Sequence, residues 1–265
     1  MYKKTLVIAR TGDIENAPEN TLPAFESAIS RGADGVELDV HLSLDGELIV
    51  HHFYNLGTTD NGEGLVSEHT LAELKALDSG SWFDKRFADE PKPKLSEVFD
   101  LCKGRTRLEV DLKDSSAAFL RKVVGEIERF DLVGEVELTT AHYPMLTHAK
   151  KINPGLQTGT FFDKPPDWMP IRLAQRHILD WATLLEIAVV HLDIALITPD
   201  FVDSLHRSGF IVHGSNLDSA DQIQRGLKLD IDSFSTGHLR LALQLRDEFV
   251  PSSSGSMFIN PKSKF

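Results

Sequence analysis

The sequence predicts a TIM-type (β/α)8 barrel, in which parallel strands alternate with helices and close into a ring. Three observations favour this fold. Short β-rich runs alternate with amphipathic runs of helical length along the chain. The 265 residues are enough to build such a barrel as a single domain. The chain also lacks the GxGxxG and GxxxxGKS/T motifs of nucleotide-binding open sheets, so a doubly wound open sheet is the second choice.

Each element follows from its local pattern. The first helix is predicted by apolar residues at helical spacing, Leu22, Phe25, Ala28 and Ile29, with Gly32 as a helix stop. The expected strands are Leu6–Ala9, Gly35–Leu42, Leu48–His52, Arg107–Leu112, Val136–Thr140, Gln157–Phe161, Val189–Ile194, Ile211–Gly214 and Ser233–Thr236. The expected helices are Thr21–Arg31, Thr70–Leu77, Leu95–Leu101, Ala117–Arg129, Tyr143–Lys151, Trp168–Leu185, Pro199–Ser208 and Ser219–Leu229.

Two stretches between these elements have the composition of surface loops. Asn55–Gly64 and Ala88–Lys94 predict a small insertion after the third strand, where Asn61-Gly62 signals a turn. The barrel domain is expected to occupy residues 1–250. Residues 251–265 are polar and rich in Ser and Gly, which predicts a flexible tail.

Composition narrows the range of partners. Lys and Arg total 28 against 40 Asp and Glu, a net charge of −12. This balance is unsuited to nucleic acid, whose binding depends on neutralising phosphates. We expect a small-molecule substrate, and an anionic one would need a metal ion or a few placed cations.

No apolar stretch approaches the roughly 20 residues of a membrane helix. Cys102 is the only cysteine, which excludes an intrachain disulfide and fits a cytoplasmic protein. The sequence leaves a homo-oligomer open.

Acidic residues alternate along two of the predicted strands. Side chains at i and i+2 point to the same side of a strand, so Glu37 and Asp39 share a face, as do Glu109, Asp111 and Lys113. Functional side chains of such barrels gather at the C-terminal ends of the strands. Converging carboxylates form an oxygen-ligand site suited to Mg²⁺ or Ca²⁺ rather than a cysteine-based zinc site. The alternative is that these residues are solvated or salt-bridged strand ends.

Other polar residues near strand ends suit phosphate chemistry. His51 and His52 end the third expected strand, and because neighbouring side chains face opposite ways only one can enter the site. A histidine there can transfer protons at neutral pH, although a structural histidine is the alternative. Ser215 and Asn216 follow a late strand, where barrels often bind phosphate, but such residues are common in any loop. The other histidines near strands are interpreted as structural: His142, His191 and His213.

A series of motifs points to a known family. Pro18–Thr21 reads Pro-Glu-Asn-Thr, and Gly32–Val40 reads Gly-Ala-Asp-Gly-x-Glu-x-Asp-Val, specific in wording and spacing. Further matching segments follow in order: Asp45-Gly46, His52, Asn61-Gly62 and Leu77–Phe83. Together they resemble the glycerophosphodiester phosphodiesterase family, closely from about residue 6 to residue 115 and loosely beyond.

The resemblance implies a barrel, a divalent metal ion and hydrolysis of glycerophosphodiesters to glycerol 3-phosphate and an alcohol, within lipid and glycerol metabolism. It also implies roles for individual residues. The implied metal ligands are Glu37, Asp39 and Asp111, with Glu109 as a substitute because Asp111 is one methylene shorter than the family's glutamate. The implied acid/base is His52. The residues implied near the substrate are Glu19, Asn20 and Lys113.

Several family positions carry other residues. Arg10-Thr11-Gly12 stands where the family has His-Arg-Gly, Phe53 replaces an aspartate and Thr58 replaces an arginine. Ser215-Asn216 replaces a Trp-Thr pair. Arginine stays protonated near neutral pH. Arg10 can therefore hold a phosphate or stabilise developing charge, but it cannot shuttle a proton.

Three hypotheses follow from these replacements. The preferred one is an active metal-dependent phosphodiesterase in which His52 is the remaining acid/base. The second is a weakly active or inactive relative that binds a phosphorylated ligand or serves a partner. The third keeps the barrel and the chemistry but changes the diester substrate.

Overall fold

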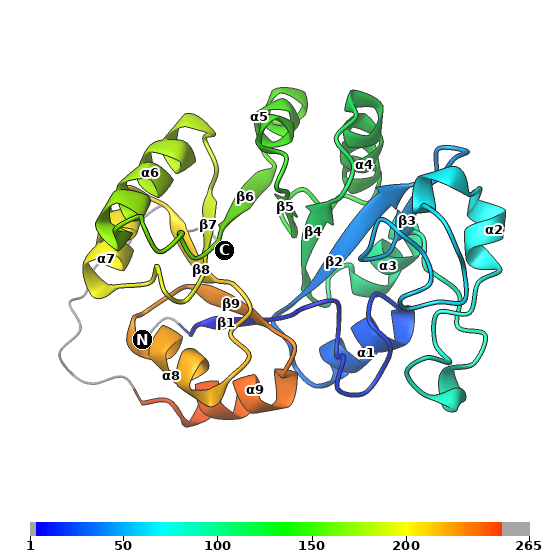
Figure 1. The fold of residues 1–265 in the computed structure, drawn as a ribbon, viewed down its shortest axis with the longest axis horizontal. Coiled ribbons are helices and arrows are strands. Elements are labelled where there is room, and N and C mark those ends of the chain that lie inside the picture. Colours follow the sequence, from blue (N-terminus) through cyan, green and yellow to red (C-terminus); the bar gives the residue numbers. More distant parts are fainter. Residues whose placement is uncertain (1–3, 251–265) are drawn as a thin grey trace.

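A computed structural model describes residues 4–250, which form a closed barrel of eight parallel strands surrounded by helices (Figure 1). The strand order is β1-β9-β8-β7-β6-β5-β4-β2, and the pairing of β1 with β2 closes the ring. The predicted TIM-type barrel is confirmed. The barrel strands are β1 (Leu6–Ala9), β2 (Gly35–Leu42), β4 (Arg107–Leu112), β5 (Val136–Thr139), β6 (Gln157–Phe162), β7 (Val189–Leu192), β8 (Ile211–Gly214) and β9 (Ser233–Thr236).

Helices follow the strands and bury their apolar faces against the ring. The first one shows how the sequence sets such a helix: the Thr21 hydroxyl accepts from the Ala24 N–H at the N-cap, and Pro23 lies in the first turn. Phe25 and Ala28 are fully buried against the strands. The helices are α1 (Leu22–Ser30), α3 (Leu95–Cys102), α4 (Ala117–Arg129), α5 (Tyr143–Ile152), α6 (Ile171–Leu184), α7 (Pro199–Arg207), α8 (Ala220–Lys228) and α9 (Leu239–Glu248).

The third predicted strand exists, but its expected place in the parallel barrel is wrong. β3 (Leu48–Val50) pairs antiparallel with the end of β2, with Val50 opposite Val40. The five residues 43–47 between the strands are too few for the crossover that a parallel neighbour requires. Gly46 allows the tight turn, because its φ of 78° lies in the left-handed region. His51 and His52 follow β3 and do not end it.

The predicted insertion after β3 spans residues 51–94 and contains short helical segments. Its centre is ionic: Lys92 Nζ donates to Asp60 Oδ2 at 2.7 Å and to Ser79 Oγ at 3.0 Å, and it lies 3.3 Å from His51 Nδ1. A small apolar cluster with Ile49, Leu56, Val66 and Leu74 packs nearby. The segments are η1 (Val66–Glu68), α2 (Leu71–Lys75) and η2 (Lys85–Phe87).

Two helices differ from the sequence-based expectation. α9 was not among the expected helices. Its leucines at 239, 241, 243 and 245 alternate along the sequence, yet its buried residues are Leu239, Ala242 and Arg246, at helical spacing. α6 begins at Ile171 instead of Trp168, because the chain before Pro170 is held out of the helical region. The expected tail, residues 251–265, lies outside the described residues. Within residues 4–250, every helix is too short or too polar to cross a membrane.

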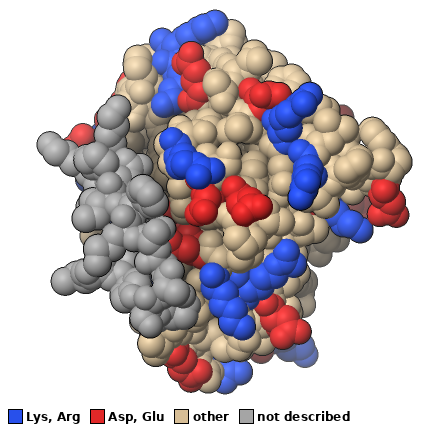
Figure 2. Space-filling model, turned by 90° about the vertical axis from the view of Figure 1, so that its left-hand side faces the viewer, with Lys and Arg blue, Asp and Glu red and all other residues tan. Residues whose placement is uncertain are grey.

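Alternate strand residues point into the barrel and form layers. β2 and β4 are in register, so Glu37 lies beside Glu109, and Asp39 lies beside Asp111 nearer the C-terminal ends. We call that C-terminal end the mouth. The outer surface mixes charges: across the face at the left of Figure 1, Lys and Arg side chains are interspersed with Asp and Glu (Figure 2).

Candidate active site

Carboxylates from two adjacent strands meet an ammonium group at the mouth. Lys113, just after β4, places Nζ 2.8 Å from Asp39 Oδ1 and 2.6 Å from Asp111 Oδ2. Glu37 precedes Asp39 on the inner face of β2, and these two residues are only 7% and 2% exposed. The residues that the sequence grouped therefore lie together. We call them the mouth group: Glu37, Asp39, Asp111 and Lys113.

The segment between β1 and α1 orients two of these carboxylates. The Thr11 N–H donates to Glu37 Oε2 at 2.9 Å, and the Asn20 side-chain amide donates to Asp39 Oδ2 at 2.8 Å. Thr11 and Asn20 both have left-handed backbones, with φ of 52° and 54°. Asn tolerates this region, whereas β-branched Thr is strained there. Strain of this kind persists where surrounding contacts enforce it, commonly at functional sites.

Electrostatics at the mouth favour an additional cation. Burial, and then repulsion by Asp39 and Asp111, raises the pKa of Glu37 well above its ordinary value. Burial also raises the pKa of Asp111, although Lys113 opposes the shift. Asp39 and Asp111 share the Lys113 ammonium, while Glu37 accepts from the Thr11 N–H, and buried negative charge without a counter-ion is costly. The all-oxygen donor set of Glu37, Asp39 and Asp111 suits Mg²⁺ or Ca²⁺.

His52 lies at the same mouth, on the chain that follows β3. Its Nδ1 is 3.5 Å from Glu19 Oε1, and this contact raises the pKa of His52 above its ordinary value although burial opposes the shift. Phe53, in place of the family's aspartate, stacks on the His52 ring with centroids 4.6 Å apart. The adjacent His51 instead contacts Lys92 inside the insertion. Only His52 of this pair lies beside Glu19.

Arg10 and Ser215 follow β1 and β8 at the mouth. Arg10 Nη2 lies 3.2 Å from Asp218 Oδ2, and each side chain is 33% exposed. Asp218 Oδ1 accepts from the Gly237 N–H and the Thr236 hydroxyl, which fixes the carboxylate that pairs with Arg10. The Ser215 hydroxyl is buried without a hydrogen-bond partner among the described residues.

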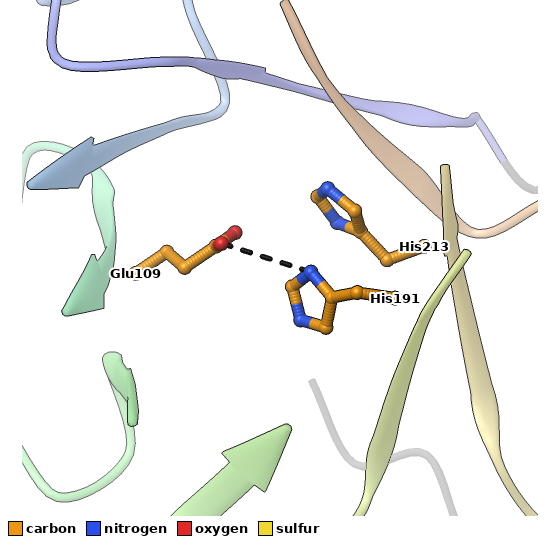
Figure 3. Close-up of side chains that lie close together, drawn as sticks. All are labelled: Glu109, His191 and His213. Carbon is orange, nitrogen blue, oxygen red and sulfur yellow. Dashed lines mark ion pairs between the residues drawn. The ribbon is translucent and has the colours of Figure 1, made fainter. Parts of the chain in front are cut away.

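Glu109 belongs to the deeper layer and faces histidines there (Figure 3). Its Oε1 lies 3.7 Å from His191 Nδ1, while His191 Nε2 lies 2.7 Å from Glu137 Oε1. The rings of His191 and His213 stack with centroids 4.2 Å apart. Burial lowers the pKa of His191 to about 3 and raises that of Glu137 to about 7. We call these residues the interior group: Glu109, Glu137, His191 and His213.

Comparison with known proteins decides the family. The family described as "Glycerophosphoryl diester phosphodiesterase family" matches residues 12–240. The chain belongs to this family. A glycerophosphodiester phosphodiesterase of Caldanaerobacter subterraneus is 33% identical, over 88% of this chain and 94% of its own. Another, from Bacillus altitudinis, is 30% identical over 92% of this chain and 99% of its own. The resemblance drawn from the motifs is thus confirmed.

Solved structures agree on the fold of the family. An Oleispira antarctica phosphodiesterase in complex with the product sn-glycerol-3-phosphate is 25% identical, with a TM-score of 0.81 over 92% of this chain and 97% of its own. A glycerophosphodiester phosphodiesterase from Agrobacterium tumefaciens is 24% identical, with a TM-score of 0.77 over 91% of this chain and 99% of its own. The latter likeness shows the fold alone.

Sequence reasoning missed two parts of this arrangement. Asp218 was not singled out, although a carboxylate shortly after a late strand is a signal for a partner of Arg10. Glu137 was also missed, although it alternates with Thr139 on β5 and so shares the inner face. The stacking of His191 on His213 has no signal in the sequence, because only the β7–β8 register brings them opposite each other.

Proposed function

We propose that this protein is a metal-dependent phosphodiester hydrolase that cleaves glycerophosphodiesters to glycerol 3-phosphate and an alcohol, in lipid and glycerol metabolism. The observation that carries the proposal is the cluster of Glu37, Asp39 and Asp111 on neighbouring strands, with the Lys113 ammonium between Asp39 and Asp111. Family membership supports the reaction class. The likeness to a phosphodiesterase that binds sn-glycerol-3-phosphate supports the product.

The mouth residues are suited to hold an anionic phosphodiester. Glu37, Asp39 and Asp111 would hold a divalent cation, which would supply positive charge to the phosphoryl oxygens and polarise the nucleophile. The Lys113 ammonium, shared by two carboxylates, lies where it can also neutralise a phosphate oxygen. The partly exposed Arg10 adds a second fixed positive charge, and the unpartnered Ser215 hydroxyl adds a donor.

His52 carries out the proton transfer in this proposal. Its Nδ1 faces Glu19, which favours the protonated ring and leaves Nε2 to donate. As the nucleophile attacks phosphorus, the P–O bond to the alcohol breaks and the His52 proton goes to the departing oxygen. Arg10 stays protonated and cannot act as a base. No second histidine stands at the position of Arg10 to take the proton of the nucleophile, so an attacking water would have to be acidified by the bound cation and release its proton to solvent.

The test is turnover by the full chain of glycerophosphocholine and of an aryl phosphodiester, with Mg²⁺, Ca²⁺ or Mn²⁺ added, and with EDTA as the control. We expect EDTA-sensitive release of product, faster for the aryl diester. Release of glycerol 3-phosphate from glycerophosphocholine would identify the bond that is cut. Absence of EDTA-sensitive turnover with every metal and both substrates would overturn the proposal.

A second candidate function is binding of a phosphorylated ligand with little hydrolysis. The Arg10–Asp218 ion pair favours it, because it stands where the family has a histidine. This function predicts that glycerol 3-phosphate raises the melting temperature while turnover is near background. It also predicts that the double variant Arg10→His/Thr11→Arg gains turnover. A double variant that is no faster than the parent would count against it.

A further inference from the structure

The interior group has a feature that the proposed reaction does not use. His191 Nδ1 and His213 Nε2 are buried without hydrogen-bond partners among residues 4–250, and both side chains are almost fully enclosed. Figure 3 shows the two rings and the Glu109 carboxylate converging on one point inside the barrel. The three ligand atoms all lie within 4.8 Å of one another.

The hydrogen bond made by the outward nitrogen of each imidazole ring determines whether the inward nitrogen can carry a lone pair. His191 Nε2 lies 2.7 Å from Glu137 Oε1, and in the tautomer in which this nitrogen donates to the carboxylate, Nδ1 presents its lone pair to Glu109. His213 Nδ1 lies 2.9 Å from Ser233 Oγ, which can accept in the same way. Both inward nitrogens then present lone pairs to the carboxylate of Glu109. In these tautomers two ring nitrogens and the Glu109 carboxylate face one another, an arrangement that repels unless a cation, or a proton on one of the three groups, lies between them.

We propose that the interior of the barrel binds one divalent transition-metal ion of the zinc type through His191 Nδ1, His213 Nε2 and a carboxylate oxygen of Glu109. Two imidazoles and a carboxylate form a donor set that zinc takes in proteins, whereas Mg²⁺ and Ca²⁺ prefer oxygen alone. Glu137 and Ser233 are the outer partners that orient the ligating rings. This site is separate from the mouth group and does not depend on the proposed reaction.

The spacing of the three ligand atoms is compatible with a bound ion, and a cavity beside them provides a path for its entry. Bonds of about 2.0–2.2 Å in a tetrahedron separate ligand atoms by about 3.3–3.6 Å. The 3.7 Å between Glu109 Oε1 and His191 Nδ1 is close to that spacing. A cavity of about 220 Å³ at the N-terminal ends of the strands is lined by Glu109, Glu137 and His213. It offers an entry path and space for a water molecule as the fourth ligand.

The experiment uses Co²⁺ as a coloured probe of the full chain after treatment with a chelator. Four-coordinate Co²⁺ with nitrogen ligands absorbs visible light far more strongly than Co²⁺ in a six-coordinate oxygen site. We expect one strongly absorbing Co²⁺ per chain, displaced by Zn²⁺. His191→Gln and His213→Gln should each abolish the band. His148→Gln, on the exposed face of α5, should keep it. The double variant Asp39→Asn/Asp111→Asn should also keep it.

Two measurements protect the test against variants that fail to fold. Ser233→Ala keeps all three ligands and should weaken Co²⁺ binding by about 10-fold, as the loss of an outer partner does. Crystals soaked with Zn²⁺ should show an anomalous peak between the three ligand atoms. The proposal is overturned if the native chain gives no strong band, if the band survives both histidine variants, if the Asp39/Asp111 variant removes it, or if no peak appears there.

Discussion

The mouth group and the interior group share strand β4, two residues apart, yet they balance their buried negative charge differently. At the mouth, Lys113 contacts Asp39 and Asp111 directly, and all candidate ligands are oxygens. In the interior, Glu109 faces imidazoles that burial keeps neutral, as the lowered pKa of His191 shows. The layer in which a side chain sits therefore decides which cation its surroundings suit. The two proposed sites would place hard-cation and transition-metal chemistry along the same strand.

The largest expected effect tests whether the mouth group alone supports turnover. Asp39→Asn removes a carboxylate that contacts both Lys113 and Asn20, and it should lower kcat/KM by about 10³-fold, equivalent to several kcal/mol of metal-assisted stabilisation. Asp203→Asn, exposed on α7, is the matched control and should leave kcat/KM unchanged. Steady-state kinetics with saturating Mg²⁺ measures both. Equal activity of the two variants would remove Asp39 from the site.

The insertion holds a third buried ionic group, Lys92 with Asp60. It differs from the mouth and interior groups because each charge has its counter-ion within the group. Lys92 and Asp60 have side chains 2% and 0% exposed. Lys92→Ala leaves Asp60 buried without its cation and should lower the free energy of unfolding by about 3–5 kcal/mol. Lys75→Ala breaks a partly exposed pair with Glu97 and should lower it by at most about 1 kcal/mol. Urea unfolding compares them, and similar losses would contradict the distinction.

The pH profile tests whether the mouth has one acid/base residue. His52→Gln should lower kcat by about 10²-fold, the lower end of what a general acid contributes. Glu19→Gln should act more subtly, because Glu19 raises the pKa of His52, and Asp39 and Lys113 face the same ring with opposite effects. Without the carboxylate the pKa of His52 falls, so the protonated form is lost at lower pH. The alkaline limb of the kcat profile should then move to lower pH, and an unmoved limb would exclude His52 as the acid.

The smallest effect concerns the Ser215 hydroxyl at the end of β8. Its lack of a partner predicts that it donates to a bound phosphate, a hydrogen bond worth about 0.5–1.5 kcal/mol. Ser215→Ala should therefore raise KM by roughly three- to tenfold with little change in kcat. Ser30→Ala, exposed on α1, is the control. A lower kcat with KM unchanged would place the hydroxyl in the transition state instead.

The sequence predicted the barrel because periodicity is local information. The i, i+2 spacing of Glu37 and Asp39, and of Asp111 and Lys113, likewise predicted their shared face, and the register of β2 and β4 brings the pairs together. Longer-range contacts had no such signal. The antiparallel β3 looked like another barrel strand, since strand direction depends on the short turn before it.

The interior group illustrates the limit more sharply. His191 and His213 were interpreted as structural one by one, because nothing in either local sequence shows that the two rings stack. Their proximity to each other results from the β7–β8 register, and the closure of the barrel places both strands across from β4. Charge compensation across the barrel depends on contacts between residues far apart in the chain, and a single sequence does not show these contacts.

Strand β4 carries residues of both the mouth group and the interior group, so any change in its length moves both sites at once. A deletion of one residue before Glu109 would turn both Glu109 and Asp111 outward towards the helices and bring Val110 inward. A deletion of two would keep the inner face but move Asp111 down to the level of Glu109. In the insertion at residues 51–94, adding or removing one residue does not turn a row of side chains from one face of a strand to the other. Over evolution we therefore expect length changes to collect in that insertion, while β4 keeps its length even in relatives whose substrates have diverged.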